Sequence, residues 1–282
     1  MFIPANLLGI LSAITSALVW GSGDFTGGFA SRRSHSLQVL VLSALSGIGV
    51  LVLGAILWQE GLPSLRSALW AVSAGVVGTM GVAALYRGLG QQNAASIAPV
   101  SAVIGAGLPV GYGMLTEGTP DALRLAGFGL ALLGIWLVSQ AENGGFKINR
   151  SGLGLAVVAG LGFGGFFILI AQVEHGLVFT PLIVSRTFTF LTSLLLLRLS
   201  SLKLPSVRGN PLALLAGVLD AGGNIFFLAA RQLTRLDVAV VLSSLYPAVT
   251  VLLAFFLQKQ KISISQWLGV GVCVAAIVMI TA

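Results

Sequence analysis

Residues 211–231 read PLALLAGVLDAGGNIFFLAAR, an apolar stretch with one acid, Asp220, near its centre. As an α-helix that rises about 1.5 Å per residue, it would span the roughly 30 Å of hydrocarbon in a bilayer. A carboxylate at that depth costs about 2.5–3.5 kcal/mol on insertion scales, so we expect Asp220 to face a wet interior, to be neutral or to be paired. Asn224 follows one turn later on the same face. Both residues are therefore candidate binding residues.

The composition is that of an integral membrane protein. Of the 282 residues, 56% are hydrophobic and 8% are charged, whereas a soluble domain carries about 25% charged residues. The net charge of +7 comes from scattered Lys and Arg without a basic stripe, which argues against a nucleic-acid partner. The lone Cys273 lies in an apolar run and supports neither a disulfide nor a CxxC site. We expect no metal and no cofactor.

Ten apolar segments can be recognised along the chain. Each is long enough for a spanning helix and too continuous for the strands of a membrane barrel. No basic region precedes the first segment, so we expect a retained helix rather than a signal peptide. We predict an all-α membrane protein with ten transmembrane helices, at residues 6–30, 37–58, 66–88, 94–116, 121–140, 152–173, 181–200, 210–230, 237–257 and 264–282.

The second half of the chain repeats the first. Leu115–Gly127 lines up with Leu257–Gly269 at an offset of 142, and Trp20-Gly21 lines up with Phe163-Gly164 at an offset of 143. Because each unit holds five spans, the second must enter the membrane from the opposite side, and substrate sites in such inverted pairs lie near the midplane. We predict two inverted five-helix repeats around a central cavity, at 1–141 and 152–282, joined by a loop at 142–151.

Loop charges predict the orientation. One face, reached after helices 1, 3, 5, 7 and 9, carries ten Lys and Arg residues, and the other carries four. Because cytoplasmic loops are enriched in Lys and Arg, the first face is expected in the cytoplasm and both termini outside. The expected location is the plasma membrane, crossed many times. The ten are Arg32, Arg33, Arg87, Lys147, Arg150, Arg198, Lys203, Arg208, Lys259 and Lys261; the four are Arg66, Arg124, Arg231 and Arg235.

Several short motifs stand in a particular order within this five-plus-five pattern. They are Trp20-Gly-Ser-Gly-Asp-Phe25, Ala84-Leu-Tyr-Arg87, Ser244-Leu-Tyr-Pro-Ala-Val-Thr250, and the glycines Gly127 and Gly269. In this arrangement the chain resembles the ten-helix EamA-type members of the drug/metabolite transporter superfamily. The resemblance implies a two-fold pseudosymmetric bundle, a cavity lined by helices 1, 3, 4, 6, 8 and 9, and alternating-access export of small metabolites. One departure is Lys259, where family members often carry a Glu, as the first repeat does at Glu117.

Three charged residues within predicted spans are the main site candidates. Asp24 shares a helix face with Trp20, and is either a proton or cation site or an interfacial acid paired with Arg32 or Arg33. Asp220 is either a functional acid or half of a structural pair with Arg186. Arg186 in turn either binds Asp220 or a substrate carboxylate, or snorkels to the surface. Phe163 and Phe167 align with Trp20 and Asp24, so we expect a cavity that is acidic on one side and aromatic on the other.

Further candidates concern the cavity wall and breaks in helices. Met80 aligns with Asn224 and is either a facing apolar wall or ordinary packing. Tyr246 either offers its hydroxyl to substrate or makes an interhelical hydrogen bond. Pro99, Pro109 and Pro247 are expected to interrupt helices 4 and 9, with a flexible Gly105 aligned with Pro247.

These features favour a secondary transporter over an enzyme. The hypothesis is an exporter of an amino acid or an amphipathic cation, coupled to protons through Asp220 and Asp24, because desolvation favours the neutral form of a midplane acid. The alternatives are a proton-independent facilitator or exchanger, a lipid flippase and a scaffold. No nucleophile, metal-ligand or paired-carboxylate arrangement supports hydrolytic chemistry. The expected partners are the substrate, a coupling ion and membrane lipids, and the protein is expected to be a monomer or homodimer.

Overall fold

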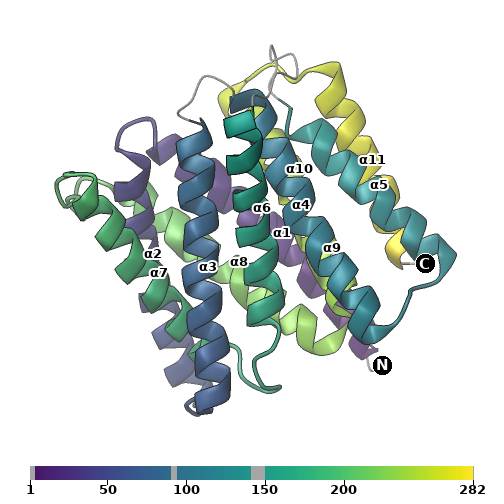
Figure 1. Cartoon of the computed structure of the whole chain (residues 1–282), viewed down its shortest axis with the longest axis horizontal. Coiled ribbons are helices and arrows are strands. Elements are labelled where there is room, and N and C mark those ends of the chain that lie inside the picture. The colour runs from purple at the N-terminus through teal and green to yellow at the C-terminus, as the bar shows by residue number, and fades with distance from the viewer. Residues whose placement is uncertain (1–3, 90–93, 141–149, 282) are drawn as a thin grey trace.

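The computed structural model describes residues 4–89, 94–140 and 150–281, and every regular element within these ranges is a helix (Figure 1). The helices are α1 (Ala5–Ala30), α2 (Ser36–Trp58), α3 (Leu65–Leu89), α4 (Ala94–Glu117), α5 (Ala122–Val138), α6 (Arg150–Ile170), α7 (Phe179–Leu199), α8 (Pro211–Leu233), α9 (Leu236–Ser243), α10 (Tyr246–Gln258) and α11 (Ile264–Thr281).

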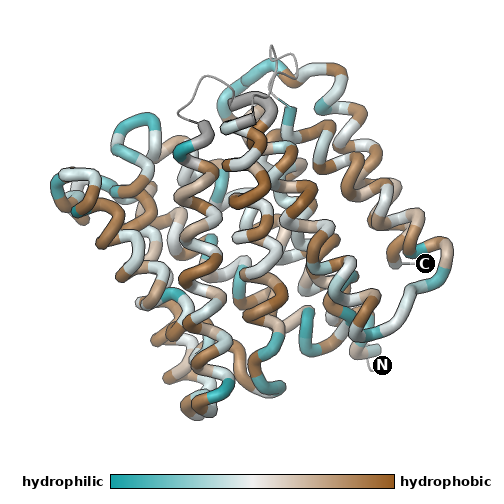
Figure 2. The backbone as a smooth tube through the Cα atoms, in the orientation of Figure 1, coloured by the Kyte–Doolittle hydropathy of each residue, from teal (hydrophilic) through white to brown (hydrophobic). Residues whose placement is uncertain are grey.

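The predicted all-α architecture of membrane-spanning helices is confirmed. Nine stretches of the described residues are long and apolar enough to cross a bilayer, and α9 and α10 together form one of them, Leu236–Gln258. The tenth span is α5, whose 17 residues lie at the short end of the range for a transmembrane helix. Hydrophilic residues gather in the connections at the two ends of the bundle, while hydrophobic residues run along the helices (Figure 2). The predicted boundary loop at 142–151 lies almost entirely outside the described residues.

Helix packing follows the pseudo-two-fold relation between the halves. The pseudo-two-fold relation makes α1 equivalent to α6, α2 to α7, α3 to α8, α4 to α9–α10, and α5 to α11. The close contact of α1 with α8 therefore has its counterpart in α6 with α3, and that of α2 with α8 in α7 with α3. The pairs α2–α7 and α5–α11 each join a helix to its own counterpart, and they lie at opposite sides of the bundle (Figure 1).

Glycine allows the backbones of α3 and α6 to touch. A Cβ added to Gly162 would lie 2.5 Å from the Cα of Gly81, so no side chain fits between the two helices there. In lipid, helices associate through such close packing and not through a hydrophobic driving force. Other glycines of α6 serve a second interface, because Cβ atoms added to Gly160 and Gly164 would lie 2.5 and 2.9 Å from side-chain atoms of Ile104 and Leu108 on α4.

We expect Gly162→Ala to lower the free energy of unfolding by about 1–3 kcal/mol, because the added methyl group must push α3 and α6 apart. The matched control is Gly154→Ala on the same helix, where an added Cβ meets nothing within 4 Å and alanine improves helix propensity. The midpoint of thermal unfolding in detergent measures both. Equal midpoints for the two variants would contradict the close contact between α3 and α6.

The two ends of the bundle differ in how they are tied. We call the end that carries the start of α1 and the end of α11 the terminal end, and the other the distal end (Figure 1). At the terminal end, the Glu60 carboxylate accepts hydrogen bonds from the backbone N–H groups of Val178, Phe179 and Thr180, at 2.9, 3.1 and 2.6 Å. These are free N–H groups at the start of α7, so Glu60 caps a helix far away in sequence.

The prolines have different effects in the two halves. α4 continues through Pro99 and Pro109, so the predicted interruption of that span is wrong. A proline removes one backbone hydrogen bond, and the carbonyl that Pro109 leaves free, that of Gly105, faces α6 at Gly164, where an added Cβ would lie only 3.1 Å away. The ninth span does break where Pro247 falls, between α9 and α10.

Candidate functional site

An ion pair between α7 and α8 lies in the middle of the bundle. A guanidinium nitrogen of Arg186 contacts the carboxylate of Asp220, and the Arg186 side chain is 14% exposed against 36% for Asp220. Gly47 on α2 leaves room for the guanidinium, since an added Cβ would lie 2.9 Å from Arg186 Nε. Ser43 accepts a further, long hydrogen bond from Arg186 at 3.4 Å. Of the alternatives for Arg186, the structure shows pairing with Asp220 and not snorkelling.

Asn224 is fixed against the same carboxylate. Its side-chain amide donates to the Asp220 carbonyl at 2.7 Å and to the Asp220 carboxylate at 3.4 Å. Asn224, Arg186, Ser185 and Thr189 line a cavity of about 20 Å³, which has room for about one water molecule. The cavity is far too small for a metabolite.

Asp24 lies on α1, which packs against α8 beside Asp220. The α1 helix is held against α8 by two hydrogen bonds, from Ser16 to the Gly223 carbonyl at 2.8 Å and from the Trp20 indole to the Asp220 carbonyl at 3.2 Å. One turn beyond Trp20, Asp24 is exposed and lies close enough to Asp220 for the two carboxylates to repel each other. Arg32 and Arg33 stack on the Phe29 ring instead, so the alternative pairing with Asp24 is not seen.

Aromatic rings from α1, α6, α8 and α10 form a cluster beside these acids. Trp20 lies 5.7 Å from Phe167, 5.9 Å from Phe227 and 6.3 Å from Tyr246, measured between ring centroids. Trp20, Phe167 and Phe227 are all buried. Phe167, the counterpart of Asp24, lies in the cluster, whereas Phe163, the counterpart of Trp20, packs against Gly105 of α4. The cavity with an acidic and an aromatic side stays a prediction. The rings of Tyr246 and Trp20 meet in a T-shaped arrangement, and Tyr246 lies near Asp24 and Asp220.

The charges of the central site do not balance. Two carboxylates, Asp24 and Asp220, stand against one guanidinium, Arg186, which leaves one uncompensated negative charge when all three are ionised. Arg186 contacts Asp220, so Asp24 is the acid without a cation among the described residues. A net charge in a membrane interior is costly unless a proton, a cation or water neutralises or solvates it. This site is therefore suited to a single positive charge.

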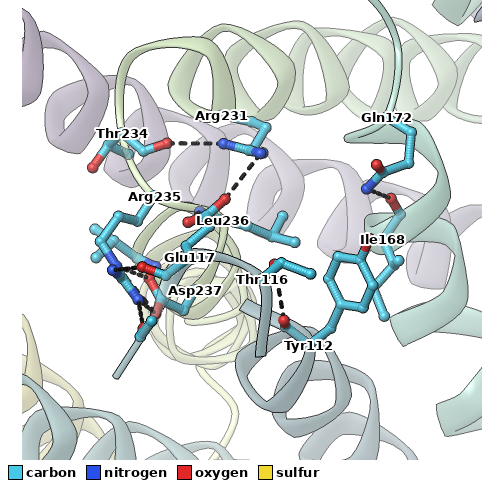
Figure 3. A network of polar contacts seen from close by, with 12 residues as sticks. Tyr112, Thr116, Glu117, Ile168, Gln172, Arg231, Thr234, Arg235, Leu236 and Asp237 are labelled. Carbon is cyan, nitrogen blue, oxygen red and sulfur yellow. Dashed lines mark hydrogen bonds and ion pairs between the residues drawn. The ribbon is translucent and has the colours of Figure 1, made fainter. Parts of the chain in front are cut away.

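A second polar cluster, which the sequence did not predict, lies at the terminal end, where α4 ends and α8 connects to α9 (Figure 3). Glu117, at the end of α4, pairs with Arg231 at 2.9 Å and accepts a hydrogen bond from the backbone N–H of Leu236 at 3.0 Å. Arg235 donates to the Glu117 carbonyl at 2.9 Å and to the fully buried Asp237 at 2.7 Å. The hydrogen bonds and charge of Asp237 raise the pKa of Arg235, so this guanidinium stays charged. We call Glu117, Arg231, Arg235 and Asp237 the terminal latch.

A family comparison assigns this arrangement. The model of the EamA-like transporter family matches residues 7–140 and again residues 150–282. The chain belongs to the EamA-like transporter family. The two matches coincide with the two repeats, so this EamA-like protein is a membrane transporter of small solutes built from two copies of one unit.

Individual relatives support the fold. The uncharacterized protein MJ1333.1 of Methanocaldococcus jannaschii is 26% identical over 129 residues, which cover 46% of this EamA-like chain and 93% of that protein. That relative is thus about as long as one repeat. A solved crystal structure superposes with a TM-score of 0.75 at 17% identity and covers 97% of this chain and 96% of its own. At that identity the likeness shows the shared fold alone.

The remaining predicted residues of the EamA-like protein do not line the cavity beside the ion pair. Met80 is 58% exposed and does not line the cavity beside the ion pair, so its role as a facing wall stays a prediction. Gly105 packs against Phe163 of α6, where an added Cβ would lie 3.1 Å from the Phe163 Cβ. The gating roles proposed for Pro99, Pro109, Gly105 and Pro247 also stay predictions.

Proposed function

We propose that this protein exchanges a small amphipathic cation for a proton, with Asp24 as the residue that carries one or the other. The observation behind this proposal is the charge of the central site, where Arg186 neutralises Asp220 and no cation among the described residues pairs with Asp24. A monovalent cation or a proton at Asp24 restores neutrality. The site is then neutral whether it holds the cation or the proton. The protein therefore avoids most of the cost of an uncompensated charge in hydrocarbon during both halves of the exchange.

The aromatic cluster supports an organic cation as substrate. The faces of Trp20 and Tyr246 attract cations, and the edge of the cluster stands beside the two carboxylates. A substrate with an ammonium group and an apolar body would place the charge at Asp24 and the body against these rings. The Asp220–Arg186 pair would fix α7 and α8 and offer a guanidinium to a substrate that also carries a carboxylate, such as an amino acid with a cationic side chain, whose net charge is +1.

Loop charge supports export. The distal end carries the larger number of Lys and Arg residues, which favours a cytoplasmic position for it and an outside position for the termini. The terminal latch ties α4 to the α8–α9 connection at the other end, which would hold that end shut. An Asp24 that is reached from the cytoplasm would collect a cation there, release it outside and return with a proton.

We expect Asp24→Asn to abolish uptake of tetraphenylphosphonium driven by a pH gradient in proteoliposomes. This probe has a fixed charge, so it brings no proton of its own. The control is the double variant Arg186→Gln/Asp220→Asn, which removes one positive and one negative charge and leaves the net charge at Asp24 unchanged. The double variant should keep pH-driven uptake, although its affinity for the probe is free to change.

Two results would reject this proposal. Full pH-driven uptake by Asp24→Asn would remove Asp24 from the coupling step. Uptake by the wild type that is the same with and without a pH gradient would favour the alternative, a facilitator or exchanger that does not use protons.

A further inference from the structure

The terminal latch has a pseudosymmetric counterpart at the distal end. Arg231 stands two residues before the last residue of α8, and Arg87 stands two residues before the last residue of α3, its repeat partner. Glu117 ends α4, and its counterpart by the repeat alignment is Lys259, directly after the end of α10. The two-fold exchange therefore converts the Arg231–Glu117 pair into Arg87 and Lys259.

One residue of the counterpart pair, Lys259, carries the opposite charge to its equivalent in the terminal latch, Glu117. At the terminal end, Arg231 meets an acid at 2.9 Å, with both side chains about one-fifth exposed, at 22% and 21%. At the distal end, both positions are cationic, both residues are exposed, and neither has an ion pair within the described ranges. Closing the distal end as the terminal end is closed would bring two positive charges together. The interaction that stabilises one closed end thus opposes the other.

The two halves of the ninth span show the same asymmetry in packing. Every residue of α9, next to the terminal latch, is buried, whereas Ala248 is the one buried residue of α10. The α10 helix is attached to α1 near its start, where Thr250 donates to the Gly21 carbonyl at 3.1 Å. Beyond that contact its residues are half-buried, and only Phe256 and Leu257, near its distal end, are exposed. The break before Pro247 separates a fully buried half from a half-buried one.

We propose that this unequal pairing of charges is a built-in bias that holds the resting protein closed at the terminal end and open at the distal end. The terminal latch lowers the energy of the observed state, and repulsion between Arg87 and Lys259 raises the energy of the opposite one. The binding of substrate or of a proton must offset this bias before the distal end can close. The bias does not depend on which solute is carried.

Single cysteines can report on each end in a Cys273→Ala background, because Cys273 is the chain's one cysteine. Gly28→Cys lies one turn from Asp24 on the same helix face, in open space on the way to the distal end. Val110→Cys is buried on α4, about two turns below Glu117. In purified protein, a charged methanethiosulfonate reagent should modify Gly28→Cys quickly and Val110→Cys slowly.

Two charge substitutions test the bias. Lys259→Glu supplies the missing acid opposite Arg87 and should slow modification of Gly28→Cys by about fivefold, the effect of a partly exposed ion pair. Glu117→Gln weakens the terminal latch and should speed modification of Val110→Cys by a similar factor. The control is Lys261→Glu, which makes the same charge change in the same loop at a position without a counterpart in the latch. Lys259 has a φ of 53°, and this left-handed backbone conformation is about equally unfavourable for Lys and Glu, so the substitution adds no backbone strain.

The proposal fails if Lys259→Glu and Lys261→Glu slow modification of Gly28→Cys equally, since general loop charge would then explain the effect. It also fails if Val110→Cys reacts no faster in Glu117→Gln. Each variant is first compared with its parent by size-exclusion profile and unfolding midpoint, and Glu117→Asp serves as a folded substitute that keeps the acid. Recovery of slow modification in Glu117→Asp is the expected result, and fast modification there would contradict the role of the carboxylate.

Discussion

Arg186→Gln is expected to destabilise the protein by about 3 kcal/mol. The substitution leaves Asp24 and Asp220 together at mid-depth without a cation, and removal of one partner from a buried pair costs about 3–5 kcal/mol. We place the effect at the lower limit because the Asp220 side chain is 36% exposed. The midpoint of thermal or denaturant unfolding in detergent measures the loss. Transport of tetraphenylphosphonium should fall with it, because the site then carries two uncompensated charges.

Two comparisons separate this effect from a general loss of positive charge. Arg198→Gln, near the distal end of the same helix and exposed, should change stability little. The double variant Arg186→Gln/Asp220→Asn should recover most of the lost stability, because replacing both members of a buried pair is often close to neutral. Equal destabilisation by Arg186→Gln and the double variant would show that the guanidinium acts through packing and not through its charge.

Trp20→Ala is expected to lower the free energy of unfolding by about 2 kcal/mol and to let protons cross the membrane without substrate. The substitution removes the ring that contacts Phe167, Phe227 and Tyr246, and also the hydrogen bond to the Asp220 carbonyl. In water-soluble cores this change costs about 3–5 kcal/mol, but part of that cost is hydrophobic transfer, which is smaller in lipid. Proteoliposomes should then pass protons without substrate, since the cluster no longer fills the centre of the bundle.

Trp58→Ala provides the control for the indole itself. Trp58 is 75% exposed at the end of α2, so its removal should leave proton leak unchanged and stability nearly so. If Trp20→Ala proteoliposomes hold a pH gradient as well as those of Trp58→Ala, the cluster around Trp20 does not act as a barrier.

Most of the fold could be predicted from the sequence because the lipid environment permits few backbone structures. Backbone groups in hydrocarbon must be bonded within helices, so ten apolar segments mean ten spans. The repeat offsets and the odd number of spans per unit then predict the inverted pair. The sequence did not predict that α4 would remain continuous, because whether a proline bends or breaks a helix depends on what surrounds the freed carbonyl. Here Gly164 on α6 provides that surrounding.

The site could be predicted in part. An isolated acid near the centre of a span identified Asp220, and spacing along the helix identified Asn224, Trp20 and Asp24. The sequence left open whether Arg186 pairs with Asp220, binds a substrate carboxylate or snorkels to the surface, since pairing depends on how α7 and α8 face each other. It also assigned proton coupling to Asp220 first, whereas the pairing with Arg186 favours Asp24.

The terminal latch was missed because its members lie in short loops and at helix ends. In a sequence, charges at such positions are indistinguishable from ordinary interfacial residues that set orientation. Glu117 and Arg231 come from different halves of the chain, and their meeting depends on the two-fold packing. The signal that was available is the change of Glu117 to Lys259 between aligned repeat positions.

The most direct test of the account is a count of the protons that purified protein releases when it binds tetraphenylphosphonium, read with a pH indicator in weakly buffered detergent solution. If Asp24 holds either a proton or the cation, the wild type and the Arg186→Gln/Asp220→Asn variant should each release protons on binding, and Asp24→Asn should release none. Proton release by Asp24→Asn equal to that of the wild type would contradict the account.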